Sequence, residues 1–500
     1  MNTETRKERD ELGEMDIEGD ALYGIHSLRA KSNFPVSDIC PFHIEWYQNI
    51  GLVKKACYLT YVKYKHELTK KYDLKRITIP LIYDHVLKCL MESSQEIING
   101  DHFQHFIVPG ISGGAGTSIN LNVNEIICNL TKIKLSESVG LSDAIGLINS
   151  IDPIETANVF QSTNDVIPSA LKITLIFLLK KLEDEISCLR KEIEKKENIY
   201  RDVLRIGYTQ LQEAVPTSFG KLFSSQQRAL SRDWWRVSKC FERLKTINIG
   251  GGAIGTGLAI PQFFIFEVIN QLREISNLPL TRGEDLTDTT SNLDVLVEVH
   301  AILKAHAVNL EKISSDLRLL ASDFHGQFQL CLPKKQVGSS IMPAKINPVI
   351  AEFVISSSHK IYVNDQLVSS LCGQGHLELN AYLPIIGHTM IESIKLLIAA
   401  NKTLNQNMIQ DLNINLNIRS EESKKKPSIS TALIPYIGHK QAAKVASLMR
   451  EKSLDIESAC QELNILSGVL DRETLNRILS PGELLKLGFT YKEILERLEF

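Results

Sequence analysis

Apolar residues recur at alternating steps of three and four along two long segments of the chain. The first series comprises Leu175, Leu179, Leu182, Ile186, Leu189 and Ile193. The second, which includes one histidine, comprises Leu296, Val299, Leu303, His306, Leu310, Ile313, Leu317 and Leu320. This spacing keeps one apolar stripe along an α-helix and favours nearly parallel packing against other helices. The sequence therefore predicts a mostly α fold with a central bundle of long helices.

Proline and polar residues predict where elements begin and where domains divide. Pro168 precedes the first apolar series and predicts the start of its helix, because the first helical turn tolerates a missing N–H. The polar segment from Asn413 to Ser430 predicts a linker. We expect a mixed N-terminal domain over residues 1–150, a helical-bundle domain over 151–410 and a small helical C-terminal domain over 411–500.

The charge balance excludes some classes of partner. The 500-residue chain is 43% hydrophobic and carries 56 basic against 59 acidic side chains, for a net charge of −3. This balance gives no positive field for nucleic acid or for an anionic membrane. The stretch Leu171–Leu179, taken as the most apolar, is interrupted by Lys172 and is too short to cross a bilayer. With no apolar signal segment after the charged N-terminus, we expect a cytoplasmic protein without membrane or nucleic-acid partners.

Neither a metal nor an organic cofactor is predicted. The nine cysteines are scattered and form no Cys-x-x-Cys pair, which fits a reducing compartment and argues against a zinc site or a redox dithiol. The residues Gly250–Gly255 match Gly-x-Gly-x-x-Gly. That pattern binds a dinucleotide only inside a βαβ unit, and here we expect helical flanks.

Four segments mix glycine with small polar residues in an otherwise helical context. They are Gly113–Asn120, Gln161–Asp165, Gly207–Gln212 and Gly338–Pro348. Their hydroxyls, amides and exposed backbone N–H groups suit the binding of small carboxylates. Taken singly, the first three are better explained as turns and helix caps, but together with the fourth they are not. The fourth is more specific.

The segment Gly338–Pro348 reads Gly-Ser-Ser-Ile-Met-Pro-x-Lys-x-Asn-Pro and resembles the signature of the aspartase/fumarase superfamily. The other three segments resemble further regions of that family, and so do Tyr23–Ala30 and Thr431–Gly438. The resemblance covers nearly the whole chain. It implies a homotetramer of three-domain, mostly helical subunits, in which each active site is assembled from three subunits and acts on a small dicarboxylate.

The resemblance also implies a role for each site residue. Ser339 is expected to be the catalytic general base, on a loop that closes over the substrate. A carboxylate that becomes an enediolate would be held by Thr117, Ser162, Thr163 and Ser340. The other carboxylate would be held by Thr209, Lys345 and Asn347, and Asn164 would face the leaving amino group. The loop must surround the Ser339 oxygen with N–H donors, because a serine alkoxide is improbable in water.

Gln210 favours an amino acid as the substrate. Fumarases carry histidine at the corresponding place, and a neutral amide cannot take up a proton as imidazole can. We therefore expect Gln210 to line a site that eliminates ammonia from L-aspartate to give fumarate. The alternatives are a fumarase-like lyase, a lyase for another succinyl compound, and a catalytically inactive tetrameric scaffold.

Several residues depart from the family pattern and leave the substrate, its pathway, metal activation and regulation open. Arginine is usual at Tyr208, asparagine at Ala259 and histidine near Asp152. The family usually reads Gly-Pro-Arg where this chain has Asp323-Phe324-His325.

Overall fold

The computed structural model describes residues 5–73, 77, 81–139, 141–324, 328–343, 345–415, 424–466 and 468–498. The departure at His325, residue 344 of the Gly338–Pro348 segment and residues 416–423 of the predicted linker lie outside the described residues. Helices predominate within the described ranges, which confirms the prediction of a mostly α fold. The chain divides into two compact units. The predicted domain boundaries at 150 and 410 remain a prediction.

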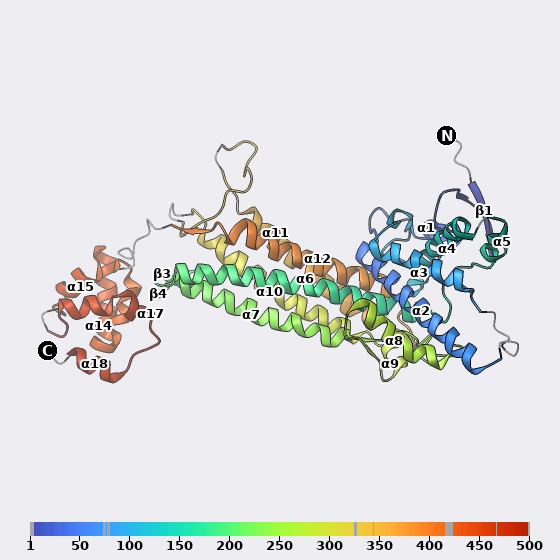
Figure 1. Ribbon diagram of the computed structural model, residues 1–500. Helices are drawn as coiled ribbons and strands as arrows, with labels where there is room; N and C mark the ends of the chain where they lie inside the picture. The colour runs from blue at the N-terminus through green and yellow to red at the C-terminus, as the bar shows by residue number, and fades with distance from the viewer. Residues whose placement is uncertain are drawn as a thin grey trace. The chain divides into compact units, whose positions relative to one another are not determined.

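Long helices dominate the middle of the chain (Figure 1). They are α6 (Thr163–Ile199), α7 (Phe219–Leu244), α10 (Asp294–Leu320), α11 (Val349–Cys372) and α12 (Leu383–Leu404). The two predicted apolar series lie in α6 and α10, and every member except Leu320 is buried. Burial of these stripes against neighbouring helices is the main source of stability for helices of this length.

Unit 1 comprises Met1–Glu183, Trp235–Ala307 and Ser357–Ile398. Besides parts of the long helices it contains β1 (Thr5–Asp10), β2 (Gly13–Glu18), α1 (Ile25–Asn33), α2 (Ile44–Lys71), α3 (Asp84–Asn99), α4 (Thr117–Val139), α5 (Leu141–Asn149), β5 (Thr246–Ile247), α8 (Gln262–Ser276), β6 (Thr281–Arg282) and α9 (Leu286–Ser291), with short 3₁₀ turns at Phe103–His105 and Gly114–Gly116. β1 and β2 form an antiparallel hairpin, whereas β5 and β6 pair in parallel.

A buried hydrogen-bond network joins three helices within unit 1. His300 of α10 is fully buried, with its Nδ1 3.1 Å from Asp365 Oδ1 of α11 and its Nε2 2.9 Å from Ser393 Oγ of α12. Burial lowers the pKa of His300, and the hydrogen bond to Asp365 opposes this shift. All three side chains are satisfied inside the helical core, so we interpret this arrangement as structural.

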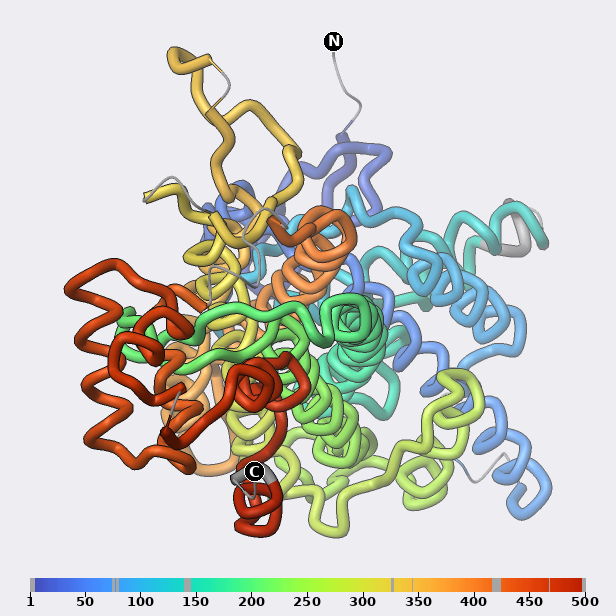
Figure 2. The backbone as a smooth tube through the Cα atoms, turned by 90° about the vertical axis from the view of Figure 1, so that its left-hand side faces the viewer, coloured from blue at the N-terminus to red at the C-terminus, as the bar shows by residue number. Residues whose placement is uncertain are grey.

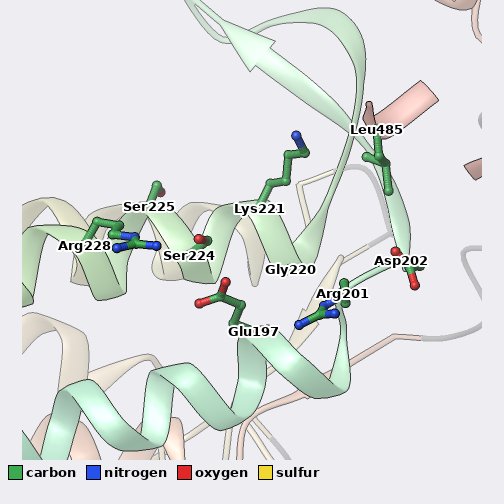
Figure 3. A pocket seen from close by; sticks show the side chains of 9 residues that line it. All are labelled: Glu197, Arg201, Asp202, Gly220, Lys221, Ser224, Ser225, Arg228 and Leu485. Atoms are coloured by element: carbon green, nitrogen blue, oxygen red, sulfur yellow. The ribbon is translucent and has the colours of Figure 1, made fainter. Parts of the chain in front are cut away.

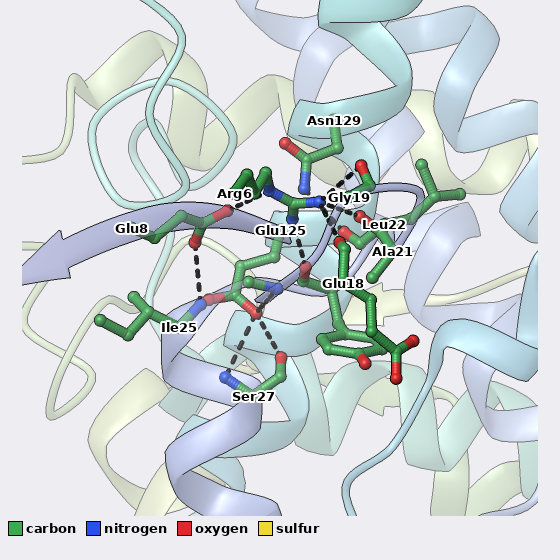
Figure 4. Close-up of polar contacts among 12 residues, drawn as sticks. Arg6, Glu8, Glu18, Gly19, Ala21, Leu22, Ile25, Ser27, Glu125 and Asn129 are labelled. Carbon is green, nitrogen blue, oxygen red and sulfur yellow. Dashed lines mark hydrogen bonds and ion pairs between the residues drawn. The ribbon is translucent and has the colours of Figure 1, made fainter. Parts of the chain in front are cut away.

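The beginning of α1 is held by a carboxylate from α4 (Figure 4). Glu125 is buried and accepts hydrogen bonds from the backbone N–H groups of Gly24, His26 and Ser27 at 2.8, 2.8 and 3.2 Å. These N–H groups have no partner within their own helix, and a negative charge at this end is also favourable. Glu125 therefore acts as a helix cap supplied by another helix.

Unit 2 comprises Asp184–Trp234, Val308–Ser356 and Ala399–Phe500. Besides parts of the long helices it contains β3 (Leu204–Thr209), β4 (Gln212–Ser218), β7 (Leu330–Cys331), a π-helical turn at Asn405–Ile409, β8 (Asn413–Ile414), a 3₁₀ segment at Pro427–Leu433, α14 (Ile434–Lys452), α15 (Ile456–Glu462), α16 (Arg472–Ile478), α17 (Pro481–Leu485) and α18 (Tyr491–Leu498). The C-terminal helices share a small apolar core that includes Leu433, Val445 and Ile456. Figure 2 shows the C-terminal segment, in red, beside the β3–β4 hairpin, and strand β4 contacts both the 3₁₀ segment Pro427–Leu433 and α17.

The predicted start of α6 at Pro168 is wrong, because the helix begins at Thr163 and contains the proline. Ser162 and Asp165 supply the reason. The Ser162 Oγ accepts from the N–H of Asn164 at 3.2 Å, and Asp165 Oδ1 accepts from the N–H of Ser162 at 3.0 Å, so the two residues form a capping box. The carbonyl of Asn164, which Pro168 cannot bond, accepts instead from Asn248 Nδ2 at 2.8 Å.

One segment in the described residues, Leu383–Ile409, is long and apolar enough to cross a membrane by length and composition. Its most apolar window has a mean hydropathy of 1.4, and 61% of that window is buried inside the protein. Leu171–Leu179, in α6, lies outside this segment and is too short to cross a membrane. A largely buried helix of this kind is typical of a protein core.

Candidate active site

The Gly338–Pro348 segment forms a loop whose two ends are bonded to each other. The N–H of Gly338 donates to the carbonyl of Lys345 at 3.1 Å, and Asn347 Nδ2 donates to the carbonyl of Gly338 at 2.6 Å. A Cβ atom at position 338 would lie 2.4 Å from the Lys345 oxygen. Glycine is therefore required for the loop to close, and Asn347 shapes the loop in addition to its predicted role toward a carboxylate.

The Ser339 oxygen accepts two backbone hydrogen bonds inside this loop. The N–H groups of Met342 and Ile341 donate to Ser339 Oγ at 2.9 and 3.2 Å. Donors aimed at an oxygen favour its negatively charged form. With both lone pairs engaged, the serine proton is directed away from these donors. Ser340 and Lys345 are exposed beside it.

Thr209 and Gln210 lie at the tip of the β3–β4 hairpin. Thr209 pairs with Gln212 across the hairpin, and the two residues of the turn, Gln210 and Leu211, have φ angles of +52° and +60°. Two left-handed residues define the tight turn that matches the twist of paired strands, and side chains other than glycine, asparagine or aspartate are strained there. The turn exposes Thr209 and Gln210.

The predicted carboxylate-binding residues of unit 1 gather where α4 and α6 begin. Thr117 is the first residue of α4, and its Oγ1 donates to the carbonyl of Gly114 at 2.9 Å. One turn later, Asn120 Nδ2 donates to Thr163 Oγ1 at 3.2 Å, which joins the first turns of the two helices. Ser162 caps α6 beside them. Two helix N-termini at one place favour an anion electrostatically.

Asn164 faces a glycine-rich loop. Its Nδ2 donates to the carbonyl of Ala253 at 2.7 Å. This loop contains the Gly-x-Gly-x-x-Gly pattern, and its flanks are not wholly helical as we expected: the two-residue strand β5 precedes it and pairs in parallel with β6 after α8. However, α8 begins only at Gln262, well beyond the glycines. The loop thus does not open a helix as the dinucleotide-binding pattern requires.

A buried lysine that the sequence analysis missed lies beneath these helix ends. Lys54 of α2 is fully buried and donates from Nζ to Asn158 Oδ1 at 2.9 Å, and Asn120 Nδ2 donates to the same oxygen at 3.0 Å. Burial lowers the pKa of Lys54 to about 7. No motif marks this residue, because a lysine inside a helical sequence resembles any surface lysine.

The predicted site residues therefore fall into two groups. The first group, in unit 1, comprises Thr117, Ser162, Thr163 and Asn164. The second group, in unit 2, comprises Thr209, Gln210, Ser339, Ser340, Lys345 and Asn347. Local contacts bring together the members of the first group, and those of the loop in the second. Their roles toward a substrate remain predictions.

The structure shows the surroundings of the described residues that depart from the family pattern. Tyr208 Oη accepts from Gln329 Nε2 at 3.1 Å and is 43% exposed. Asp152 Oδ1 accepts from the N–H groups of Ile154 and Glu155 at 2.7 and 2.9 Å, so it caps a turn. Ala259 has a φ of +65°, a conformation that asparagine adopts more readily than alanine. Asp323 and Phe324 are exposed.

A surface pocket of about 510 Å³ lies elsewhere in unit 2 (Figure 3). Its charged lining residues are Glu197, Arg201, Asp202, Lys221 and Arg228, and it includes none of the predicted site residues. The first N–H groups of α7 beside it already donate within the chain, to Val203, Tyr200 and Ser218. We therefore do not assign this mixed-charge pocket to the reaction. Within the described residues, no cluster of three or more histidine, cysteine, aspartate or glutamate side chains could hold a metal ion.

Comparison with known proteins identifies the class. A family described as "Lyase" matches residues 13–362, and one described as "Fumarase C C-terminus" matches residues 429–486. The chain belongs to the fumarate lyase superfamily, as its resemblance to aspartases and fumarases predicted, and it is an aspartase-like lyase.

Its curated relatives include aspartate ammonia-lyases. That of a Bacillus species is 35% identical over 98% of this chain and 99% of its own length, and that of Escherichia coli K12 is 33% identical over all of both. Among solved structures, a fumarate lyase:delta crystallin from Brucella melitensis bound to cobalt is 31% identical, with a TM-score of 0.86 over 97% of this chain and 100% of its own. A class II fumarase from Schistosoma mansoni, 24% identical, shares the fold with a TM-score of 0.83 over 96% of this chain and 99% of its own.

Proposed function

We propose that this protein catalyses the reversible elimination of ammonia from L-aspartate to give fumarate, with Ser339 as the general base. The observation that carries the proposal is the pair of backbone N–H donors on Ser339 Oγ. The full-length similarity to aspartate ammonia-lyases supports the substrate.

The reaction removes a weakly acidic proton from the carbon beside one carboxylate and then expels ammonia from the neighbouring carbon. A serine can accept that proton only if its alkoxide form is stabilised. Each well-placed donor contributes on the order of a few kcal/mol to charge stabilisation in a water-poor site. The Met342 and Ile341 N–H groups supply two such donors before any substrate arrives.

The remaining residues bind the two carboxylates. In this proposal Thr117, Ser162, Thr163 and Ser340 hold the carboxylate that becomes the enediolate, and two helix N-termini reinforce them. The second carboxylate contacts Lys345, Thr209 and Asn347, with Gln210 nearby. Asn164 faces the leaving amino group.

We further propose a homotetramer with active sites shared between subunits, working in the cytoplasm. The shared site follows from the family resemblance. A reducing compartment is supported by the nine cysteines, all of which are unpaired.

The proposal is tested by following fumarate through its ultraviolet absorbance, with L-aspartate or L-malate as the substrate. Aspartate should give fumarate, and Ser339→Ala should lower kcat on the order of 10³-fold. Ser356→Ala is the matched control, because Ser356 is an exposed serine of α11 that bonds only its own helix. It should leave kcat unchanged.

Two outcomes would favour the alternatives. Fumarate from malate and not from aspartate would assign a fumarase-like activity. If neither compound reacts, and fumarate does not react with ammonia in reverse, the protein acts on another succinyl compound or serves as a scaffold.

A further inference from the structure

One fully buried carboxylate next to the predicted site residues has no role in the proposed chemistry. Asp165 lies in the first turn of α6, and its exposed fraction is 0%. Its Oδ1 accepts from the N–H of Ser162 at 3.0 Å, and its Oδ2 accepts from the N–H groups of Gly252 and Gly250 at 2.9 and 3.2 Å. A single side chain thus joins the start of α6 to the glycine-rich loop.

The shape of that loop explains how it receives an anion. Gly250 and Gly252 have φ angles of +86° and +69°, which turn their N–H groups toward one point. Concave sets of backbone N–H groups of this kind bind anions, as glycine-rich loops bind phosphate. Here the anion is the chain's own carboxylate. The N–H groups that a dinucleotide would need are therefore occupied.

Further bonds fix the neighbouring residue from two sides. Asn164 Nδ2 donates to the carbonyl of Ala253 at 2.7 Å, while Asn248 Nδ2 donates to the carbonyl of Asn164 at 2.8 Å. The segment 162–164, which carries three of the predicted substrate contacts, is thus attached to the loop through both its backbone and its side chains.

We propose that Asp165 is a positioning residue of the active site, whose carboxylate locks the segment 162–164 onto the glycine-rich loop so that its hydroxyls are held in place for a substrate carboxylate. The inference rests on the proposed function for the identity of the substrate. A displacement on the order of 1 Å in such groups costs about 10²-fold in rate.

Titration of Asp165 should make dicarboxylate binding depend on pH. Burial raises the pKa of Asp165 to about 7, whereas its backbone hydrogen bonds and the charge of Lys54 act in the opposite direction. Protonation converts one carboxylate oxygen into a donor and weakens its bonds to the loop. Protonation of Asp165 should therefore weaken the binding of a dicarboxylate as the pH falls from 8.5 to 6.5. Lys54 gains charge over the same range and should strengthen binding of an anion, and the buried Cys57 thiol, whose pKa is raised, stays neutral.

The test compares Asp165→Asn with Glu125→Gln in the full-length protein. Glu125 is the matched control, because it is also a buried carboxylate that accepts three backbone N–H groups, but at the beginning of α1. Calorimetry measures the binding of succinate, a four-carbon dicarboxylate with no leaving group, at several pH values. Turnover of aspartate and the thermal midpoint are measured on the same preparations.

Asp165→Asn should weaken succinate binding at least 10-fold at pH 8 and lower kcat/KM on the order of 10²-fold. The difference in succinate affinity between the wild type and this variant should shrink as the pH falls from 8.5 to 6.5, because the wild-type carboxylate becomes protonated. Glu125→Gln should lower the thermal midpoint but keep binding and kcat/KM within about threefold. The inference is overturned if the Asn variant is only less stable and binds succinate as the wild type does.

If Asp165→Asn does not fold, Gly252→Ala provides the second variant. Its Cβ would meet the flexible end of Ile260 at 3.1 Å, and the positive φ disfavours alanine, so the loop N–H shifts without any change at Asp165. Weakened succinate binding is expected, and unchanged binding would contradict the inference. A wild type that binds succinate but does not convert aspartate would refute the proposed function alone.

Discussion

At the level of single residues, the Ser339 environment depends on one glycine. Gly338→Ala places a Cβ 2.4 Å from the Lys345 oxygen, so the loop ends must separate and the donors on Ser339 move. We expect kcat for aspartate to fall on the order of 10²-fold. Gly146→Ala is the control, because nothing lies within 4 Å of a Cβ there and α5 tolerates alanine. Equal activity of the two variants would show that loop closure does not matter.

Lys54 makes the stability of the protein depend on pH. Burial lowers its pKa to about 7 in the folded protein, against 10.5 for an ordinary lysine, so between these values the unfolded chain binds the extra proton. The free energy of unfolding should therefore rise with pH over this window and lose that contribution as the pH falls through 7. From pH 7 to 8.5 the wild type should gain on the order of 1–2 kcal/mol relative to Lys54→Met. Denaturant unfolding at the two pH values measures this difference, and parallel curves would contradict it.

Some single residues of the site can be predicted from the sequence, and others cannot. The Ser339 loop could be found because its motif is long and specific. The sequence indicates Asp165 only as part of a polar segment, since a serine followed three residues later by an acidic residue is typical of any helix start. Its bonds to Gly250 and Gly252, more than 80 residues away, exist only in the folded chain.

At the level of elements, apolar spacing predicted the positions of the long helices. A helix that buries one face carries apolar residues at steps of three and four along that face. The start of α6 was predicted wrongly, because the helix contains Pro168. The Asn164 carbonyl that Pro168 cannot bond accepts a hydrogen bond from Asn248, which is distant in sequence. The paired strands β5 and β6 were also missed. Two residues in each are too few for a periodic pattern.

The turn after the glycine-rich loop is strained at Ala259, where φ is +65°. Replacement by glycine relieves a clash that costs roughly 1–2 kcal/mol, partly offset by the greater freedom of glycine in the unfolded chain. We expect Ala259→Gly to raise the free energy of unfolding by up to about 1 kcal/mol. Ala301→Gly, at an exposed position inside α10, should lower it by a similar amount. The same sign for both variants in denaturant unfolding would refute the strain.

At the level of the whole molecule, the family and the mostly helical fold were predicted correctly because similarity extends along the whole chain. The long apolar segment Leu383–Ile409 is not evident from short apolar runs, because Lys395 and several polar residues interrupt it. Assembly is harder to predict. The sequence of one chain does not identify which surface residues contact another subunit. The prediction of an active site shared between subunits therefore rests on family resemblance.

The most direct measurement mixes two inactive variants. Ser339→Ala and Thr163→Ala each disable one of the two residue groups, and co-expression with different tags allows mixed oligomers to be purified on both tags. If the two groups that form a site come from different subunits, random assortment leaves about a quarter of the sites with both residues intact. Mixed oligomers should then convert aspartate to fumarate at about a quarter of the wild-type rate, while each variant alone stays inactive. Mixed oligomers as inactive as their parents would contradict a shared dicarboxylate site.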